Sequence, residues 1–195
     1  MNTSKTKPVH MIEPFLVGDL VYLRPLRYED LDGNYVHWLN NPEVCRYNSH
    51  HVFPYTREKA EEYIRYARST KDALILAIVV KETGQHIGNA SFVSIDRHNQ
   101  QAEYAIIIGE KASHGRGYGT EATTLVFEHG FHSLNLHRIR AGVNAENTPS
   151  LSLFTRVGMK QEGVLEDAIF KNGRFHNIIL FGMLKDVFMK KYPID

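Results

Sequence analysis

Three glycines stand at alternate positions in the segment SHGRGYGTEA, residues 113–122. Glycine lets the main chain approach a phosphate closely, and a helical pattern begins near Tyr118. The first turn of a helix presents unpaired N–H groups and the positive end of its dipole, which together suit a bound diphosphate. The segment therefore predicts an anion-binding loop, and a merely tight strand-to-helix turn is the alternative.

Two other phosphate-binding motifs fit this segment poorly. A P-loop requires a lysine directly after its last glycine, and no lysine follows these glycines. A dinucleotide-binding loop requires the spacing G-x-G-x-x-G after the first strand, with an acid at the end of the second strand. Here the spacing is G-x-G-x-G, antiparallel elements are expected before it, and Asn144 ends the next strand. The P-loop is excluded, and dinucleotide binding stays open as a weaker alternative.

The residues HGRGYGT resemble the acyl-CoA pyrophosphate loop of the GCN5-related N-acetyltransferases (GNAT), whose pattern is [QR]-x-x-G-x-[GA]. Two further stretches, LRPLRYEDLDGNYVHWLNNPEVCRY and NAENTPSLSLFTRVGMKQEGVL, are similar to the subgroup of ribosomal-protein N-terminal acetyltransferases. The match departs at its first position, where His114 replaces Gln or Arg. The resemblance places the cofactor loop at His114, Gly115, Arg116, Gly117, Tyr118, Gly119 and Thr120.

This resemblance implies a transferase that moves an acetyl group from acetyl-CoA to a primary amine by direct attack on the thioester. The acceptor is then a protein N-terminal α-amine, or a small-molecule amine such as an amino sugar, a polyamine or an antibiotic. Because His114 and Phe154 depart from the family pattern, a non-catalytic acyl-CoA-binding regulatory module is the alternative. No metal is expected.

The strand before the loop carries the groups that the resemblance assigns to catalysis. Ile107, Ile108 and Gly109 are expected to pair with pantetheine through their main-chain groups, and the Ile107 N–H to polarise the thioester carbonyl. A preorganised donor of this kind is typically worth ~3 kcal/mol in the transition state. Glu103 shares a strand face with Ile107 and matches the family glutamate that deprotonates the amine, often through water. The alternative for Glu103 is a solvated carboxylate at the start of a strand.

The group that meets the departing thiolate differs from the family pattern. Many members carry a tyrosine in the helix after the next strand, and Phe154, which cannot donate a proton, stands at that position. Ser150, Asn147 or a water molecule is expected to stabilise the thiolate, which needs little help at a thiol pKa near ~8.5. Asn147 and Phe154 are also expected to line the cofactor site. Asn147 and Ser150 fit equally well as helix-capping residues.

Other candidate residues have weaker support. His129 and His132 stand three apart on one predicted helix, a spacing that can bind a metal. No acidic or cysteine partner is nearby, so the interpretation as ordinary surface histidines is favoured. Cys45 has little support as a nucleophile. The irregular segment between the first two helices is expected on the acceptor side, with a packed loop as the alternative; its candidates are Tyr47, His50, His51, Phe53 and Tyr55.

Composition limits the class of protein. The chain has 195 residues, a formal net charge of +1 and no basic tract, so no nucleic-acid or membrane partner is expected. The first ten residues are polar, and the longest apolar run, Ala73–Val80, is too short to cross a bilayer. The single cysteine fits a reducing compartment. A cytoplasmic monomer or homodimer is expected.

The order of predicted elements is typical of an α+β fold with one mixed sheet of about seven strands and about four helices. The resemblance implies the GNAT fold, with the sheet splayed between its fourth and fifth strands. We expect a flexible tail over residues 1–14 and a single domain over 15–195. Strands are predicted at 20–26, at both arms of a hairpin within 73–95, and at 100–109, 137–143, 159–170 and 174–188. Helices are predicted from Asp30 to Pro42, after Thr56, from Gly117 to Ser133 and within 148–158.

Overall fold

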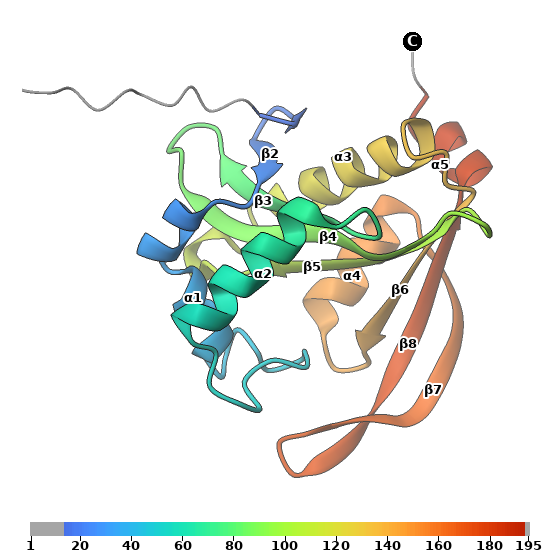
Figure 1. Ribbon diagram of the computed structural model, residues 1–195. Helices are drawn as coiled ribbons and strands as arrows, with labels where there is room; N and C mark the ends of the chain where they lie inside the picture. The colour runs from blue at the N-terminus through green and yellow to red at the C-terminus, as the bar shows by residue number, and fades with distance from the viewer. Residues whose placement is uncertain (1–13, 194–195) are drawn as a thin grey trace, which may run out of the picture.

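The computed structural model describes residues 14–193, which form one eight-stranded sheet with five α-helices around it (Figure 1). The sheet order is β1-β2-β3-β4-β5-β6-β8-β7. The strands are Leu16–Val17 (β1), Val21–Pro25 (β2), Leu74–Val80 (β3), His86–Asp96 (β4), Gln101–Ile108 (β5), Arg138–Asn144 (β6), Lys160–Lys171 (β7) and Arg174–Leu184 (β8). The helices are Tyr35–Asn40 (α1), Arg57–Ser69 (α2), Tyr118–His132 (α3), Thr148–Val157 (α4) and Lys185–Lys191 (α5), with short 3-10 helices at Tyr28–Asp32 (η1) and Lys111–Ser113 (η2).

Strands β5 and β6 form the one parallel pair of this sheet, and they diverge soon after they meet. Their pairing is confined to Gln101–Glu103 on β5 and Arg138–Arg140 on β6. The remainder of β5 has no strand on that side, whereas β6 continues beside β8 as far as Asn144. The predicted splay of the sheet is therefore confirmed. It lies between the fifth and sixth strands rather than the fourth and fifth, because the short strand β1 adds one strand at the start.

Two hydrophobic clusters cover the two faces of the sheet. One contains side chains of α3, α4 and α5, such as Phe127, Phe154 and Phe188. The other contains side chains of α1 and α2, such as Trp38 and Ile64, and Figure 1 shows α2 lying across the middle strands. Alternation along β5 sends successive side chains to opposite clusters, so the open strand is supported from both faces.

Several predicted boundaries are confirmed because local residues set them. The Thr56 hydroxyl accepts a hydrogen bond from the Lys59 N–H at 3.4 Å and caps α2. Pro149 lies in the first turn of α4, and Gly158 ends that helix in the left-handed conformation with φ of 98°. The Asn172-Gly173 turn joins β7 to β8, with φ of 53° and 83°.

Two elements differ from the prediction of seven strands and four helices. The two-residue strand β1 is too short to give a sequence pattern. Helix α5 begins at Lys185, where the sequence predicts a strand that continues to Phe188. The Phe188 ring is buried with its centroid 5.2 Å from that of Phe131 on α3, so tertiary packing overrides the local strand preference.

The helix predicted from Asp30 is divided in two. Asp30 lies inside η1, where its carboxylate accepts the Arg27 N–H at 2.9 Å, and α1 begins separately at Tyr35. Asp30 is therefore not the cap of α1, because its carboxylate is held by residues that precede it. The predicted tail, residues 1–14, lies outside the described residues apart from Pro14.

Candidate active site

The divergence of β5 from β6 leaves main-chain groups of β5 without a strand partner beyond Glu103. The Ile107 carbonyl is turned towards β4, since a Cβ added to Gly88 would lie 2.1 Å from its oxygen. Main-chain groups of neighbouring strand residues point to opposite sides. The opening therefore presents the N–H groups of Ile106 and Ile108 and the Ile106 carbonyl, whereas the family resemblance implies Ile107 as the donor to the thioester.

The glycine loop leads from β5 into α3. Gly115 and Gly117 have φ of 73° and 87°, a left-handed conformation that strains any residue with a side chain. Gly117 is the N-cap residue of α3 and offers no side-chain cap, so the first N–H groups of a 15-residue helix are left for an anion. Gly119 has an ordinary backbone conformation, and a Cβ there would meet only side-chain carbons at 3.5 Å or more. The backbone conformation thus requires glycine at positions 115 and 117 but not at position 119.

His114, at the position where the family has Gln or Arg, folds back onto the end of β5. Its Nε2 lies 3.0 Å from the Ile108 carbonyl oxygen and donates to it. Two residues later, the Arg116 guanidinium lies 5.3 Å from the centre of the Tyr118 ring. His114 thereby fixes the start of the glycine loop against the strand.

Glu121, in the first turn of α3, binds the turn between β1 and β2. Its carboxylate accepts the N–H groups of Asp19, Leu20 and Val21 at 2.8, 2.9 and 2.7 Å. Gly18 makes room for it, since a Cβ there would lie 2.5 Å from the Glu121 carboxyl carbon. No local sequence pattern indicates this role, because the three N–H groups lie about one hundred residues earlier in the chain.

Replacing Glu121 by Gln should lower the free energy of unfolding by about 1.5–3 kcal/mol, because hydrogen bonds to a charged acceptor are lost. Urea unfolding measures the change. Glu128→Gln is the matched control on the same helix, because Glu128 is exposed and should change the free energy of unfolding by less than about 0.5 kcal/mol. Equal effects of the two substitutions would show that the three N–H contacts stabilise nothing.

Glu103 lies at the point where β5 and β6 separate. Its Oε2 is 3.3 Å from Nη2 of Arg140, its partner in the last pair of the parallel ladder, and 43% of its side chain is exposed. The carboxylate is therefore reachable by a substrate and solvent. Its setting is an exposed ion pair, as the alternative of a solvated carboxylate describes.

Helix α4 holds the other expected catalytic residues. The Asn147 side chain caps the helix by accepting the Ser150 N–H at 3.3 Å, as the capping alternative predicts. The Phe154 ring is buried, with centroids 6.0 Å from Tyr104 and 5.7 Å from Phe181. It packs in the core beneath the opening. The Ser150 hydroxyl remains at the half-buried start of the helix.

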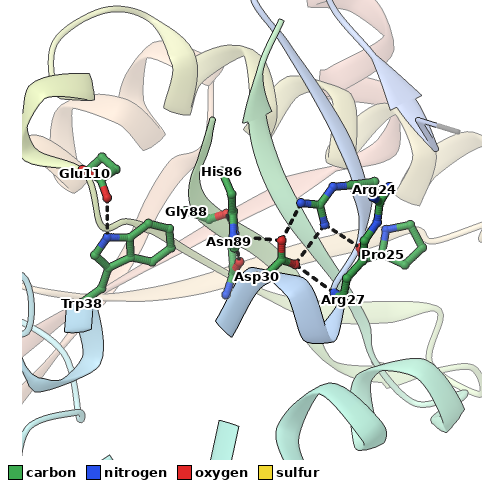
Figure 2. Close-up of polar contacts among 9 residues, drawn as sticks. All are labelled: Arg24, Pro25, Arg27, Asp30, Trp38, His86, Gly88, Asn89 and Glu110. Carbon is green, nitrogen blue, oxygen red and sulfur yellow. Dashed lines mark hydrogen bonds and ion pairs between the residues drawn. The ribbon is translucent and has the colours of Figure 1, made fainter. Parts of the chain in front are cut away.

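A buried polar network ties the N-terminal elements to β4 (Figure 2). The Arg24 guanidinium donates to both Asp30 carboxylate oxygens, at 2.9 and 2.6 Å, and His86 Nδ1 lies 3.5 Å from Oδ1. Burial raises the pKa of Asp30, but Arg24, His86 and the Arg27 N–H together outweigh it and hold that pKa below its ordinary value. Burial lowers the pKa of His86 more than Asp30 raises it, so His86 is neutral at pH 7.

Trp38 connects the same region to the strand end that precedes the glycine loop (Figure 2). Its indole N–H donates to Glu110 Oε1 at 2.8 Å, and the Asn34 amide donates to the same oxygen at 2.8 Å. A Cβ on Gly109 would lie 2.1 Å from the indole ring. Trp38 is a core residue, and it also fixes Gly109 and Glu110 at the entrance to the loop.

The segment between α1 and α2, residues 41–56, meets the tip of the β7–β8 hairpin. Lys171 at that tip donates to the His50 carbonyl oxygen. Val52 and Phe53 are exposed, and Tyr55 lies beside His50 with ring centroids 6.4 Å apart. The fold thus brings two distant segments together below the opening (Figure 1).

Two weaker candidates occupy ordinary structural settings. Burial raises the pKa of the Cys45 thiol, which disfavours the reactive thiolate. His129 packs its ring against Phe15 with centroids 4.9 Å apart.

Within residues 14–193, no three His, Cys, Asp or Glu side chains are grouped as a metal site would need. None of the helices in that part of the chain combines the length and hydrophobicity needed to cross a bilayer.

Comparisons with known sequences bear on this arrangement. A family model described as an acetyltransferase (GNAT) domain matches residues 21–160. The chain is 35% identical over 174 residues to the uncharacterized N-acetyltransferase p20 of Bacillus licheniformis, covering 87% of this chain and 96% of that protein. It is 32% identical over 160 residues to the spermidine N(1)-acetyltransferase of Escherichia coli K12, covering 82% and 83%.

Solved structures share the fold. Spermidine N-acetyltransferase from Vibrio cholerae, in complex with CoA and spermine, superposes with a TM-score of 0.78 at 24% identity and covers 87% of this chain and 98% of its own. RimJ of Mycobacterium smegmatis, in complex with CoA-disulfide, gives 0.79 at 21% identity and covers 93% and 91%. The family match and these folds agree with the glycine loop and the splayed sheet. The chain therefore belongs to the GNAT family of acetyltransferases.

Proposed function

We propose that the protein transfers an acetyl group from acetyl-CoA directly to a primary amine bound in the opening between β5 and β6. The observation that carries this is the position of the α3 N-terminus, with two left-handed glycines, at the end of the unpaired part of β5. The amine nitrogen attacks the thioester carbon, the carbon–sulfur bond then breaks, and CoA leaves as the thiol or thiolate. Residues 15–195 are proposed to act as one catalytic domain.

The cofactor is proposed to follow the open strand and end at the helix. The free N–H groups from Tyr118 onward, in the His114–Thr120 loop, suit the pyrophosphate. The main chain of Ile106 and the Ile108 N–H suit pantetheine, because these groups lack a strand partner, whereas the Ile108 carbonyl accepts from His114. We propose that one of these two N–H groups, Ile106 or Ile108, donates to the thioester oxygen. The Ile107 N–H is not available, since the Ile107 carbonyl and hence its N–H face β4.

The departing thiolate is proposed to meet a polar group of α4. Phe154 is buried and has no proton to give, while the Ser150 hydroxyl lies at the half-buried N-terminus of the helix. A thiol with a pKa near ~8.5 leaves as the thiolate with little assistance at neutral pH. The absence of a tyrosine at position 154 is therefore compatible with turnover.

Glu103 is proposed to accept the amine proton through water, and Glu103→Gln should lower kcat/KM for an α-amine acceptor by at least about tenfold. The loss should be largest at low pH, because an α-amine with a pKa near ~8 is then mostly protonated and needs the base. A pH–rate profile measures both. Glu162→Gln is the matched control, since Glu162 pairs with Arg138 nearby on the same sheet. An unchanged profile in Glu103→Gln would remove Glu103 as the base.

Thiol release from acetyl-CoA, followed with a thiol reagent across a panel of amines, tests the proposed activity. The panel includes a peptide α-amine of the ribosomal-protein type and small amines, among them amino sugars and spermidine. Release above the amine-free background with any of them supports acetyl transfer. Binding of acetyl-CoA without release would favour the non-catalytic module, and thermal stabilisation by NAD but not by CoA would favour dinucleotide binding.

A further inference from the structure

Alternation along β5 and β6 decides which side chains border the opening on the side of α1 and α2. Glu103 and Arg140 are the last pair of the parallel ladder, so their side chains point to the same face of the sheet. Ile107 shares that face and packs in the cluster beneath α1 and α2, whereas Tyr104 packs in the cluster on the other face. The Glu103–Arg140 ion pair therefore lies on the α1 and α2 face, where the two strands separate.

Arg140 has hydrogen-bonding capacity that the described part of the chain leaves largely unused. Its Nη2 is 3.3 Å from Glu103 Oε2, and 51% of its side chain is exposed. Among residues 14–193, Glu103 is the only acid that forms an ion pair with it. A guanidinium carries five N–H donors in a planar fork, so this single contact leaves donors for a ligand that enters the opening.

Arg138, two residues earlier on the same face of β6, is engaged differently. It donates to the Glu162 carboxylate, so its charge is already paired. Glu162 also lies near Arg140, since a Cβ on Gly182, the β8 neighbour of Arg140, would meet the Glu162 carboxylate. Together with Glu103, these side chains carry no net charge. A ligand with one positive and one negative group preserves this balance, whereas a polyamine adds only positive charge.

The ion pair lies within reach of the proposed reaction. Of the two candidate donors to the thioester oxygen, the Ile106 N–H is the nearer, about 10 Å along the strand from Glu103. An amine that attacks the thioester carbon, with a water molecule between that amine and Glu103, accounts for this length. A group on the carbon next to the amine can then contact the long, exposed side chain of Arg140.

An α-amino carboxylate is complementary to the Glu103–Arg140 pair. Its amine and its carboxylate share one carbon, so their nitrogen and oxygen atoms lie about 3 Å apart. This separation is close to the 3.3 Å between the Glu103 and Arg140 atoms. A carboxylate can also accept two N–H groups of one guanidinium. The amine therefore lies on the Glu103 side while the carboxylate lies on the Arg140 side.

We propose that Arg140 binds the α-carboxylate of the acceptor, so that the preferred substrate is a free α-amino acid. This rests on the proposed acetyl transfer and narrows its acceptor class. The α-amine nitrogen bonds to the thioester carbon, its proton passes to Glu103 through water, and CoA leaves with the sulfur electron pair. A peptide N-terminus has a neutral carbonyl at this place and spermidine has no oxygen, so both are poorer acceptors.

Thiol release from acetyl-CoA with each of the common α-amino acids tests the proposal. The best amino acid is compared with its amide and with the amine that lacks the carboxylate, as in phenylalanine, phenylalaninamide and phenethylamine. The free acid should have a kcat/KM about tenfold or more above both, because hydrogen bonds to a charged acceptor are stronger. A higher kcat/KM for a peptide N-terminus, an amino sugar or spermidine than for every amino acid would overturn the proposal.

Substitutions of Arg140 separate carboxylate binding from an effect on the base. Arg140→Met should raise KM for the preferred amino acid about tenfold or more and leave kcat and the KM for acetyl-CoA within about twofold. Arg140→Lys should keep part of the affinity, since lysine retains the charge but not the paired donors. Arg138→Met is the matched control and should keep the wild-type KM, because Arg138 is already paired with Glu162. An equal loss for the amino acid and its decarboxylated amine would show that Arg140 only positions Glu103.

Binding measured without turnover separates this inference from the proposed activity. If no amine releases thiol, acetyl transfer itself fails, and thermal unfolding in the presence of CoA and each common amino acid decides about Arg140. Stabilisation by an amino acid that is present in the wild type and lost in Arg140→Met supports the carboxylate site. Stabilisation that is absent, or the same in both proteins, rejects it.

Discussion

Asp30→Asn should lower the free energy of unfolding by about 3–5 kcal/mol, because it leaves one member of a buried ion pair without its partner. The Arg24 and Asp30 side chains are only 8% and 4% exposed, and two hydrogen bonds join them. An asparagine amide supplies no charge and turns two N–H donors towards a guanidinium. Urea unfolding at pH 7 measures the loss.

Asp32→Asn provides the matched control for this change. Asp32 lies two residues away and also pairs with an arginine, Arg57, but the two side chains are 70% and 52% exposed. A surface pair of this kind contributes about 0–1 kcal/mol. If the two variants lose the same free energy of unfolding, the buried pair stabilises the fold no more than the exposed pair does.

The pH dependence of stability should report the same pair. Since the pKa of Asp30 lies below its ordinary value, its contribution is present above the unfolded-state pKa of about 3.9 and is lost as the pH falls through the lower folded-state value. The wild type should therefore lose its advantage over Asp30→Asn only below about pH 4. Unfolding curves from pH 7 to pH 3 check this, and a difference that grows on acidification would contradict it.

Gly117→Ala should weaken acetyl-CoA binding tenfold or more, which corresponds to about 1.4 kcal/mol. Gly117 has φ of 87°, and a left-handed residue with a side chain costs about 1–2 kcal/mol. The added Cβ would also lie 3.4 Å from Leu20 Cδ1, on the turn that Glu121 holds. To avoid this strain, the first turn of α3 must shift, and its N–H groups no longer point at the pyrophosphate. Calorimetric titration with acetyl-CoA measures the change.

Gly119→Ala is the control, because it adds the same methyl group two residues later. Its backbone conformation is ordinary, and the new Cβ would make contacts of 3.5–3.8 Å with side-chain carbons. Acetyl-CoA affinity should stay within about threefold of the wild type, equivalent to less than ~0.7 kcal/mol. Similar losses for both glycines would point to a loop that needs flexibility throughout and would reject the conformational argument.

Trp38 joins α1 to the strand end that precedes the glycine loop. It belongs to α1, which leads into segment 41–56, yet its indole ring packs on Gly109 and its N–H holds Glu110. Because Gly109 and Glu110 connect β5 to the glycine loop, a movement of α1 changes the start of that loop. The buried network around Asp30 and His86 limits such movement.

The sequence by itself determined the features that depend on neighbouring residues. Thr56, Pro149 and Gly158 set helix ends through contacts within a few residues, and the Asn172-Gly173 turn follows from backbone preference. The glycine loop and the strand-to-helix change after it were predictable for the same reason. Three motifs in the family order indicate the GNAT fold and its splay without any tertiary contact.

Only the tertiary structure decided the features that need partners far apart in the chain. Helix α5 forms where packing of Phe188 on α3 outweighs its strand preference. The direction of the Ile107 carbonyl depends on the register with β4, which side-chain periodicity does not encode. Glu121, His114 and Lys171 each bind main-chain groups brought to them by folding. A local pattern shows which residue types are available, whereas the free energy of a buried charge or a main-chain contact is fixed by distant segments that packing brings beside it.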